Sequence, residues 1–215
     1  MDTITQYQKY PCMKPWVGSS YSSPMHKRLL VLGESHYLPK GSTVHLNAED
    51  WYENHQEALS KEEVKWLSTS GIILSNKDGN FPKKAHGIYK NTCFEINSCS
   101  FNYTLSSQAI EHFSYYNFFQ RPAEVAGNSI KVKGIDKEVA ISVLESVIKK
   151  LEPELIIFAS SLAGRFGKDV ASRRGIPFVV TPHPTCAWWN RTAKKYNGRG
   201  RDLIPAFLKK YKWIA

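Results

Sequence analysis

The sequence predicts an α/β fold with a three-layer α/β/α arrangement, in which helices cover both faces of a four-stranded, mainly parallel sheet. Two observations predict this class. Short, continuously apolar runs recur along the chain, as is typical of parallel strands that are buried on both faces. Between these runs lie longer stretches with apolar residues at helical spacing. Strands that alternate with helices in this way are typical of a parallel sheet.

The predicted strands are four apolar segments. They are residues 27–33 (KRLLVLG), 112–118 (HFSYYNF), 154–160 (ELIIFAS) and 176–181 (IPFVVT).

Two helices are expected in the second half of the chain. Asp136 can N-cap a helix to Lys150, which carries an apolar stripe at helical spacing. Ser160 or Ser161 can cap the next helix, which runs to about Arg174. The other helical segments are less regular: 48–68, in one or two pieces, short helices or loops within 69–110, and a final helix at 201–212.

We expect one α/β domain at 27–215, preceded by a polar, proline-punctuated arm at 1–26 that packs on the surface. No run of about 18 apolar residues occurs, so no membrane partner is expected. The first residues show no apolar core behind a basic start, which favours a cytoplasmic protein, or a nuclear one in a eukaryote. We expect a monomer.

The four cysteines form no C-x-x-C pair, so reduced thiols are expected, with no metal and no cofactor.

The net charge of +10 and the pI of about 9.4 favour a polyanionic partner, above all nucleic acid. Much of this charge lies near the C-terminus, where Asp202 is the only acidic residue among many basic ones. These basic residues are Arg191, Lys194, Lys195, Arg199, Arg201, Lys209, Lys210 and Lys212. The glycines of NGRGR at 197–201 would let backbone amides approach a phosphate. A merely solvated helix face and tail is the alternative.

Polar residues follow every predicted strand at the point where it ends. In an open parallel sheet the ligand site lies at the carboxyl ends of the strands. The segments that converge there are Gly33–Tyr37, Asn117–Arg121, Ser160–Ser161 and Pro182–Arg191. The sequence therefore predicts one functional site at this edge of the sheet.

Two of these segments suggest contacts with a nucleobase. His183 stands between two prolines, which hold its imidazole in a rigid loop, although a structural histidine is the alternative. Trp188 and Trp189 follow, close to basic residues, and aromatic side chains beside cations suit stacking on unpaired bases. Of two adjacent tryptophans, at most one is expected to touch a ligand. Asn117 lies between bulky aromatics, where its amide can read a base edge or serve a turn.

The order of LGESHY, YYNFFQ, ELIIFAS and TPHPT, followed by a basic loop and a last helix, resembles the uracil-DNA glycosylase superfamily. The resemblance covers roughly residues 27–212. HPTCAWWNR is similar to the family's H-P-S-P-L segment, and GESHY to its G-Q-D-P-Y-H or G-E-A-P-G motif. The resemblance implies a sheet of four parallel strands between helices. It also implies hydrolysis of the N-glycosidic bond of a base that is flipped out of DNA. The product is an abasic site, formed in repair or in defence against modified foreign DNA.

The resemblance also implies roles for single residues. His183 would stabilise the departing base anion and Asn117 would read the uracil edge. Gly33 and Tyr37 would line the base pocket, and the ring of Tyr37 would exclude a 5-methyl group. Ser160 or Ser161 would hold a DNA phosphate, and the 185–191 loop, which begins at Thr185, would enter the minor groove. The stacking phenylalanine would be Phe94 or Phe81.

The motif departs from the family at the residue that activates water. One alignment of GESHY puts Ser35, a poor general base, in the place of the family's aspartate. The other alignment puts Glu34 in an acidic position, so Glu34 is the expected base and His36 the reserve. The wedge leucine aligns near Ala187, so Trp188 would replace it. The excised base is therefore either uracil or another modified pyrimidine.

Two rival interpretations remain open. The first is a non-catalytic nucleic-acid-binding protein of the same fold, in which the loss of the aspartate means the loss of chemistry. The second is an esterase of the G-D-S type, with Ser35 as nucleophile and His183 as base. Such enzymes usually have an aspartate three residues before the histidine, where this chain has Val180.

Overall fold

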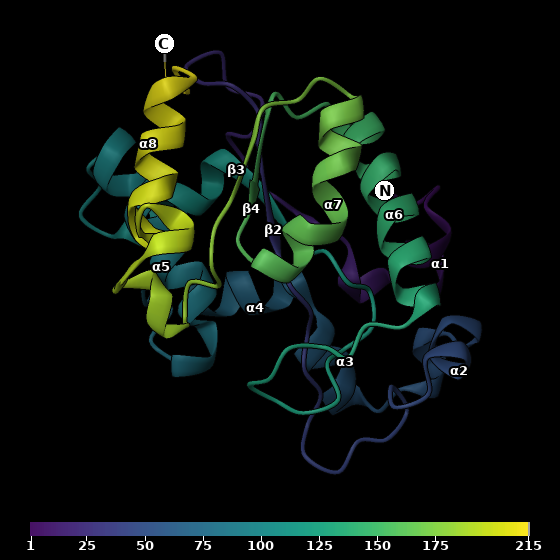
Figure 1. The fold of residues 1–215 in the computed structure, drawn as a ribbon. Helices are drawn as coiled ribbons and strands as arrows, with labels where there is room; N and C mark the ends of the chain where they lie inside the picture. Colours follow the sequence, from purple (N-terminus) through teal and green to yellow (C-terminus); the bar gives the residue numbers. More distant parts are fainter. Residues whose placement is uncertain (215) are drawn as a thin grey trace.

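The computed structural model describes residues 1–214 and has a mixed five-stranded sheet between two layers of helices (Figure 1). The strand order is β1-β3-β2-β4-β5. The strands are β1 (Trp16–Val17), β2 (Leu29–Gly33), β3 (Phe113–Asn117), β4 (Leu155–Phe158) and β5 (Phe178–Val180). Strands β2 to β5 are parallel and lie within the four predicted segments, so the α/β class and the parallel core are confirmed.

The prediction of four strands is wrong by one, because β1 adds an antiparallel edge strand. Trp16 pairs with Tyr115 and Val17 with Ser114. The indole Nε1 of Trp16 donates to the carbonyl of Ile110 across 3.0 Å, which fixes the strand at the sheet edge. A strand of two residues is too short to show an alternating pattern in the sequence.

The N-terminal segment, expected as a surface arm, places large side chains in the core. It forms α1 (Thr5–Lys9) and a 3₁₀ turn at Pro11–Met13. Tyr7 and Tyr10 are at most 1% exposed, and the ring of Tyr10 stacks on Trp51 with centroids 4.5 Å apart. Residues 1–26 are therefore integral to the packing of the α/β domain.

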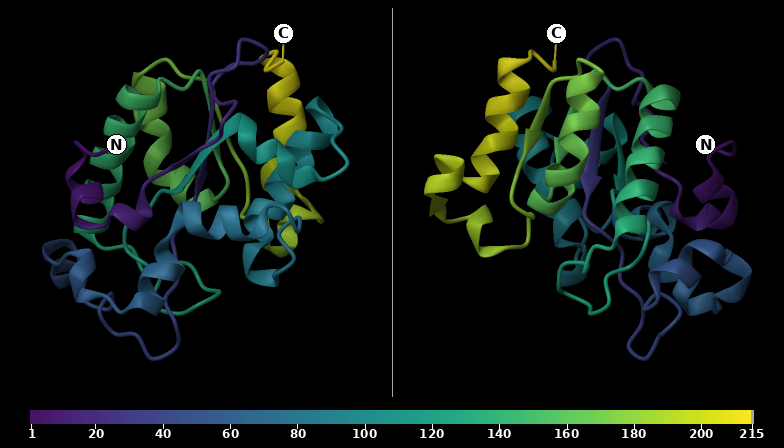
Figure 2. Two further views of the ribbon diagram at one scale, coloured as in Figure 1. Left: turned by 180° about the vertical axis from the view of Figure 1, so that it is seen from behind. Right: turned by 45° about the vertical axis from the view of Figure 1, so that its right-hand side comes forward.

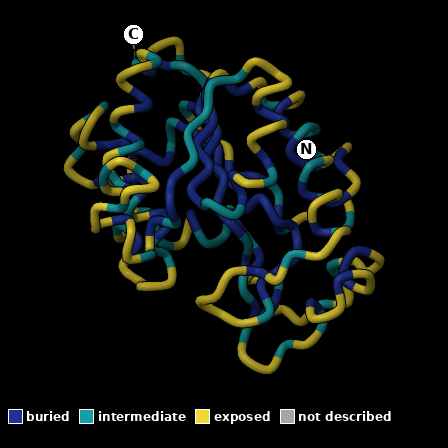
Figure 3. The backbone as a smooth tube through the Cα atoms, viewed as in Figure 1, coloured by how far each residue is buried: buried dark blue, intermediate teal, exposed yellow. Residues whose placement is uncertain are grey.

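Side chains of the strands alternate between two apolar clusters, one on each face of the sheet. In β2, Leu30 and Leu32 face the cluster beneath α6 (Gly134–Leu151) and α7 (Ser161–Arg173), whereas Leu29 and Val31 face the other cluster. That second face is covered by α5 (Gly87–Ser100) and α8 (Leu203–Lys210). Figure 2 shows these layers, and Figure 3 shows the buried strands between exposed helix surfaces.

The segment 48–68 forms two helices, in agreement with the alternative of two pieces. They are α2 (Ala48–Glu53), capped by Asn47, and α3 (Lys61–Leu67), whose capping box joins Ser60 and Glu63. The segment 69–110 contains α4 (Thr69–Asn76), α5 and several 3₁₀ turns. The final helix begins at Leu203 rather than at 201, because residues 200–202 form a 3₁₀ turn.

Helix α6 begins before the predicted cap, and Asp136 has a different role. Asp136 lies in the first turn, is fully buried and accepts the backbone N–H of Lys133. Its carboxylate also takes two hydrogen bonds from Arg121, at 2.9 and 2.8 Å. The remaining Arg121 donors reach Glu124 and the carbonyls of His45 and Lys131. All five guanidinium N–H groups are thus satisfied, so Arg121 ties the loop after β3 to α6.

None of the helices within residues 1–214 combines the length and the apolar character needed to cross a membrane.

Candidate functional site

The carboxyl ends of the four parallel strands meet at one edge of the sheet, as predicted. Gly33 pairs with Asn117, Leu32 with Phe158, and Phe158 with Val180. The residues that follow these positions therefore share one edge. Two of them, Glu34 and Ser160, are in direct contact.

Glu34 has a nearly buried carboxylate whose position is set by Ser160. Only 9% of Glu34 is exposed, and Ser160 is fully buried. The Ser160 hydroxyl donates to Glu34 Oε2 across 2.5 Å. The same oxygen, Ser160 Oγ, accepts the backbone N–H groups of Leu162 and Ala163 at 3.1 and 3.2 Å, because Ser160 is the N-cap of α7.

This arrangement leaves the Ser160 hydroxyl one direction for its proton. A serine hydroxyl has one donor and two acceptor lone pairs, and both lone pairs here face backbone amides. The proton must therefore point at Glu34. The start of α7 adds a favourable dipole for a negative charge. Ser160 or Ser161 was expected to hold a DNA phosphate; the buried Ser160 hydroxyl is fully engaged, so of the two only Ser161 stays a candidate.

Asn117 ends β3 and is also nearly buried, at 7% exposure. Its Oδ1 accepts the hydroxyl of Tyr115 at 3.0 Å, and its Nδ2 has no hydrogen-bond partner within residues 1–214. The Tyr115 hydroxyl and Asn117 Oδ1 lie against Gly33, where any Cβ would collide with both atoms. Gly33 thus makes room for this hydrogen bond.

His183 presents a neutral imidazole with a defined tautomer. Its Nδ1 lies 3.3 Å from the backbone N–H of Thr185 and 2.8 Å from the Thr185 hydroxyl. A backbone N–H can only donate, so Nδ1 accepts and Nε2 carries the proton. Burial lowers the pKa of His183, and the charge of Glu34 opposes this only in part.

Glu34 acts electrostatically on Tyr37 as well. Burial raises the pKa of the Tyr37 hydroxyl, and the negative charge of Glu34 raises it further. The same hydroxyl donates to the carbonyl of Asn128 at 3.2 Å. The structure thus brings Glu34, Tyr37 and His183 into one electrostatic environment at the edge that also holds Asn117.

Ser35 and His36, the other two residues of GESHY, are placed differently from Glu34 and Tyr37. Ser35 is half-buried, and no hydrogen bond joins it to His183 within residues 1–214. The imidazole of His36 is in the core, 5% exposed, with Nε2 3.4 Å from the Thr69 hydroxyl. Burial lowers the pKa of His36 to about 4. His36 therefore packs as a neutral core histidine beneath the site.

Helix α5 packs against the loop that follows His183, through residues that sequence reasoning did not single out. Asn91 Nδ2 donates to the carbonyl of Pro184 at 2.7 Å, and Gly87 lies so close to Thr185 that a Cβ would touch its methyl group. The ring of Tyr89 lies 4.7 Å from that of Tyr115, between centroids. Tyr115 had a signal in the sequence, since it precedes Asn117 by two residues and so shares its face of the strand.

The two candidate stacking residues are placed away from each other. Phe81 is fully buried and stacks on Tyr89 with centroids 5.3 Å apart. Phe94 is 48% exposed on the outside of α5, with the guanidinium of Arg201 over its ring at 5.5 Å. Neither ring contacts Asn117 through any interaction found within residues 1–214.

The tryptophan pair divides as expected into one buried and one exposed ring. Trp189 is 2% exposed and packs in the core, so it is not available to a ligand, whereas Trp188 is 53% exposed. Beyond them, β6 (Thr192–Ala193) and β7 (Gly198–Arg199) form a small hairpin. Tyr196, between these strands, has its hydroxyl 2.6 Å from Ser161 Oγ, which fixes the hairpin beside the start of α7.

Some basic residues of this region form ion pairs, and others do not. Arg199 forms a bidentate pair with Asp202 at 2.8 Å, and Arg201 pairs with Glu95 at 2.8 Å. Arg191, Lys194 and Lys195 are exposed and form no ion pair within the described part of the chain. These three charges and Trp188 together form the surface that we call the basic hairpin surface.

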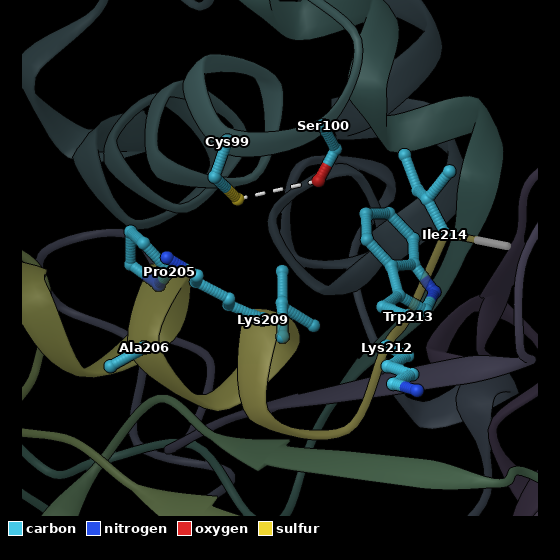
Figure 4. Close-up of a pocket in the computed structure, with 9 residues that line it drawn as sticks. Cys99, Ser100, Pro205, Ala206, Lys209, Lys212, Trp213 and Ile214 are labelled. Atoms are coloured by element: carbon cyan, nitrogen blue, oxygen red, sulfur yellow. Dashed lines mark hydrogen bonds between the residues drawn. The ribbon is translucent and has the colours of Figure 1, made fainter.

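Two surface hollows lie at the opposite end of the sheet. The larger is lined by Cys99, Ser100, Pro205, Ala206, Leu208, Lys209, Lys212, Trp213 and Ile214 (Figure 4). Trp213 donates to the carbonyl of Lys27, which precedes β2, so this hollow lies at the amino ends of the strands. Residues 1–214 contain no group of three side chains suited to hold a metal ion, and Cys12, Cys93, Cys99 and Cys186 are free thiols.

No protein-family model matches the chain, and no curated protein matches it either.

Proposed function

We propose that this chain is a DNA glycosylase that hydrolyses the N-glycosidic bond of a flipped-out uracil or other modified pyrimidine and leaves an abasic site. The observation that carries the proposal is the Glu34 carboxylate, held by Ser160 at the same edge of the sheet as Asn117 and His183. A fixed anion, an amide and a neutral imidazole at one edge are the groups that this reaction needs.

Glu34 is the proposed general base. Loss of a base from deoxyribose gives the sugar oxocarbenium character, which a preorganised negative charge stabilises. Glu34 Oε2 is engaged by Ser160, whereas Oε1 has no hydrogen-bond partner within residues 1–214. Oε1 is therefore the atom that accepts a proton from the attacking water.

His183 is the proposed partner of the departing base. Its Nε2–H is the tautomer dictated by Thr185, and this donor has no partner within residues 1–214. The lowered pKa of His183 keeps the imidazole neutral near pH 7. A neutral donor at the 2-oxygen stabilises the base anion as charge develops, without first having to lose a proton to it.

Asn117 and Tyr37 would form the base pocket, and the basic hairpin surface would bind DNA. Asn117 would supply its Nδ2 donor to the base edge, and Tyr37, whose hydroxyl is within the electrostatic influence of Glu34, would limit the size of the base at its 5-position. Extracting a base costs a few kcal/mol of stacking, which phosphate contacts and an exposed ring such as Trp188 can offset. Such an enzyme would act in DNA repair or in defence against modified foreign DNA. We expect it to be a monomer that works in the cytoplasm, or in the nucleus of a eukaryote.

The test is release of a base from synthetic DNA. Single- and double-stranded oligonucleotides would carry uracil, hypoxanthine, or hydroxymethylated or glycosylated pyrimidines, and abasic sites would be detected by strand cleavage in alkali. We expect one of the pyrimidine substrates to be cleaved, and His183→Ala to reduce that rate. Binding of DNA without release of any base would overturn the glycosylase and favour the non-catalytic nucleic-acid-binding alternative.

A further inference from the structure

We propose that Tyr115 is a specificity-determining positioning residue, which fixes the amide of Asn117 so that its Nδ2 donor faces the base and selects a 4-keto over a 4-amino pyrimidine. The inference rests on the proposed base pocket. It concerns a residue that has no part in the reaction itself.

The hydrogen bond from Tyr115 to Asn117 is built into the sheet. Tyr115 is 1% exposed and precedes Asn117 by two residues on β3, so both side chains project from the same face. The hydroxyl donates to Oδ1 at 3.0 Å. Tyr89 packs on the ring of Tyr115, and Gly33 leaves no atom between the two polar groups.

The burial of Tyr115 makes one orientation of the amide preferable to the other. Burial raises the pKa of Tyr115 far above its ordinary value, so the phenol keeps its proton and must place it on an acceptor. Two oxygens lie beside the phenol, Oδ1 of Asn117 at 3.0 Å and the hydroxyl of Tyr89, whose hydrogen bond with Tyr115 also raises the pKa of Tyr115. If Tyr89 donates to the Tyr115 oxygen, Oδ1 of Asn117 is left to accept the phenol proton. If the amide were turned over, Nδ2 would face the hydroxyl and the phenol proton would have to move from the Asn117 carbonyl to the Tyr89 hydroxyl. The Tyr89 proton would then lose its own acceptor, which is costly in a buried site.

The fixed orientation leaves Nδ2 as the group that a base would meet. An amide N–H pairs with the 4-oxygen of uracil, an acceptor. The 4-amino group of cytosine is itself a donor, so it would place two donors against each other in a nearly buried site. Asn117 is 7% exposed, so water cannot readily relieve that conflict.

Tyr116 provides a matched control on the same strand. Its side chain packs in the cluster on the opposite face of the sheet, and its buried hydroxyl has no hydrogen-bond partner in the described part of the chain, residues 1–214. Tyr115→Phe and Tyr116→Phe thus remove the same atom from neighbouring buried residues, but only Tyr115→Phe frees the Asn117 amide to turn.

The experiment measures equilibrium binding to oligonucleotides with 2′-fluoro-deoxyuridine or 2′-fluoro-deoxycytidine at one position, whose glycosidic bonds resist hydrolysis. We expect wild type and Tyr116→Phe to prefer the deoxyuridine analogue by about tenfold or more, and Tyr115→Phe to lose most of this preference while remaining folded. An unchanged preference in Tyr115→Phe, or no preference in wild type, would overturn the inference. Release of base from ordinary deoxyuridine by the wild type is scored separately, so a failed glycosylase and a failed selectivity residue give different results.

Discussion

Ser160 donates its single hydroxyl proton to Oε2 of Glu34 across 2.5 Å, while its lone pairs accept two backbone amides at the start of α7. One side chain thereby caps a helix and orients a carboxylate that lies 126 residues away in the sequence.

Ser160→Ala removes both the cap and the hydrogen bond to Glu34. We expect it to lower the free energy of unfolding by about 1 kcal/mol, the usual contribution of an N-cap. Base release should also slow markedly, because the carboxylate is no longer held in place. Ser60→Ala is the matched control, since Ser60 caps α3 but is not bonded to Glu34. Equal rates of base release in the two variants would show that Ser160 serves the helix alone.

The buried His36 and the half-buried His112 predict that acid destabilises the fold. Burial lowers the pKa of His36 to about 4 and also lowers that of His112. A histidine with a lowered pKa in the folded state stabilises the fold above the unfolded pKa of about 6.5, and this contribution is lost as the pH falls through the folded pKa. For His36 the loss between pH 6.5 and about 4 is on the order of 3 kcal/mol.

The measurement is urea unfolding as a function of pH. His36→Gln should flatten the pH dependence, whereas His55→Gln, at an exposed position, should leave it unchanged. A free energy of unfolding that stays constant from pH 7 to pH 4 in the wild type would contradict this expectation.

The ion pair between Arg121 and Asp136 is predicted to be a major stability determinant. Both side chains are fully buried, and removing Asp136 leaves the buried Arg121 with Glu124 as its one remaining carboxylate partner within residues 1–214. Asp136→Ala should therefore cost about 3–5 kcal/mol in the free energy of unfolding. Asp169→Ala, at an exposed position on α7, is the control and should cost far less. A cost below about 1 kcal/mol for Asp136→Ala would mean that Arg121 finds other compensation.

The basic hairpin surface is predicted to bind DNA through both charge and stacking. Trp188→Ala should weaken binding to single-stranded DNA by roughly 1–3 kcal/mol, whereas Trp66→Ala, on the exposed face of α3, should have little effect. Binding should weaken steeply as salt is added, and Arg191→Ala should reduce that salt dependence. A DNA affinity that does not change with salt concentration would show that these residues form only a solvated surface.

The sequence predicted the parallel core well because continuous apolar runs are a strong local signal. It also predicted that the polar residues after each strand share one edge, since that follows from the geometry of parallel sheets. Strand β1 escaped prediction because Trp16 and Val17 alone form no pattern. Its existence depends on pairing with β3, far along the chain.

The partners of the site residues could not be predicted, because they depend on side-chain directions. Glu34 turns toward Ser160 at the edge of the sheet, whereas His36, two residues later, enters the core beside Thr69. Nothing in the sequence motif GESHY predicts which of these two side chains lies at the edge of the sheet and which is in the core. The division between buried Trp189 and exposed Trp188 likewise depends on which ring the core can accept.

We propose above that Glu34 activates water for base release. Glutamine keeps the shape of Glu34 and can still accept the Ser160 proton, but it cannot take a proton from water.

The most direct measurement is therefore the single-turnover rate of base release by Glu34→Gln on the substrate that the wild type cleaves, with DNA binding measured in parallel. Glu49→Gln, at an exposed position on α2, is the control. We predict a loss of at least about 100-fold in rate for Glu34→Gln with DNA binding retained. A Glu34→Gln variant that releases the base at the wild-type rate would contradict the account.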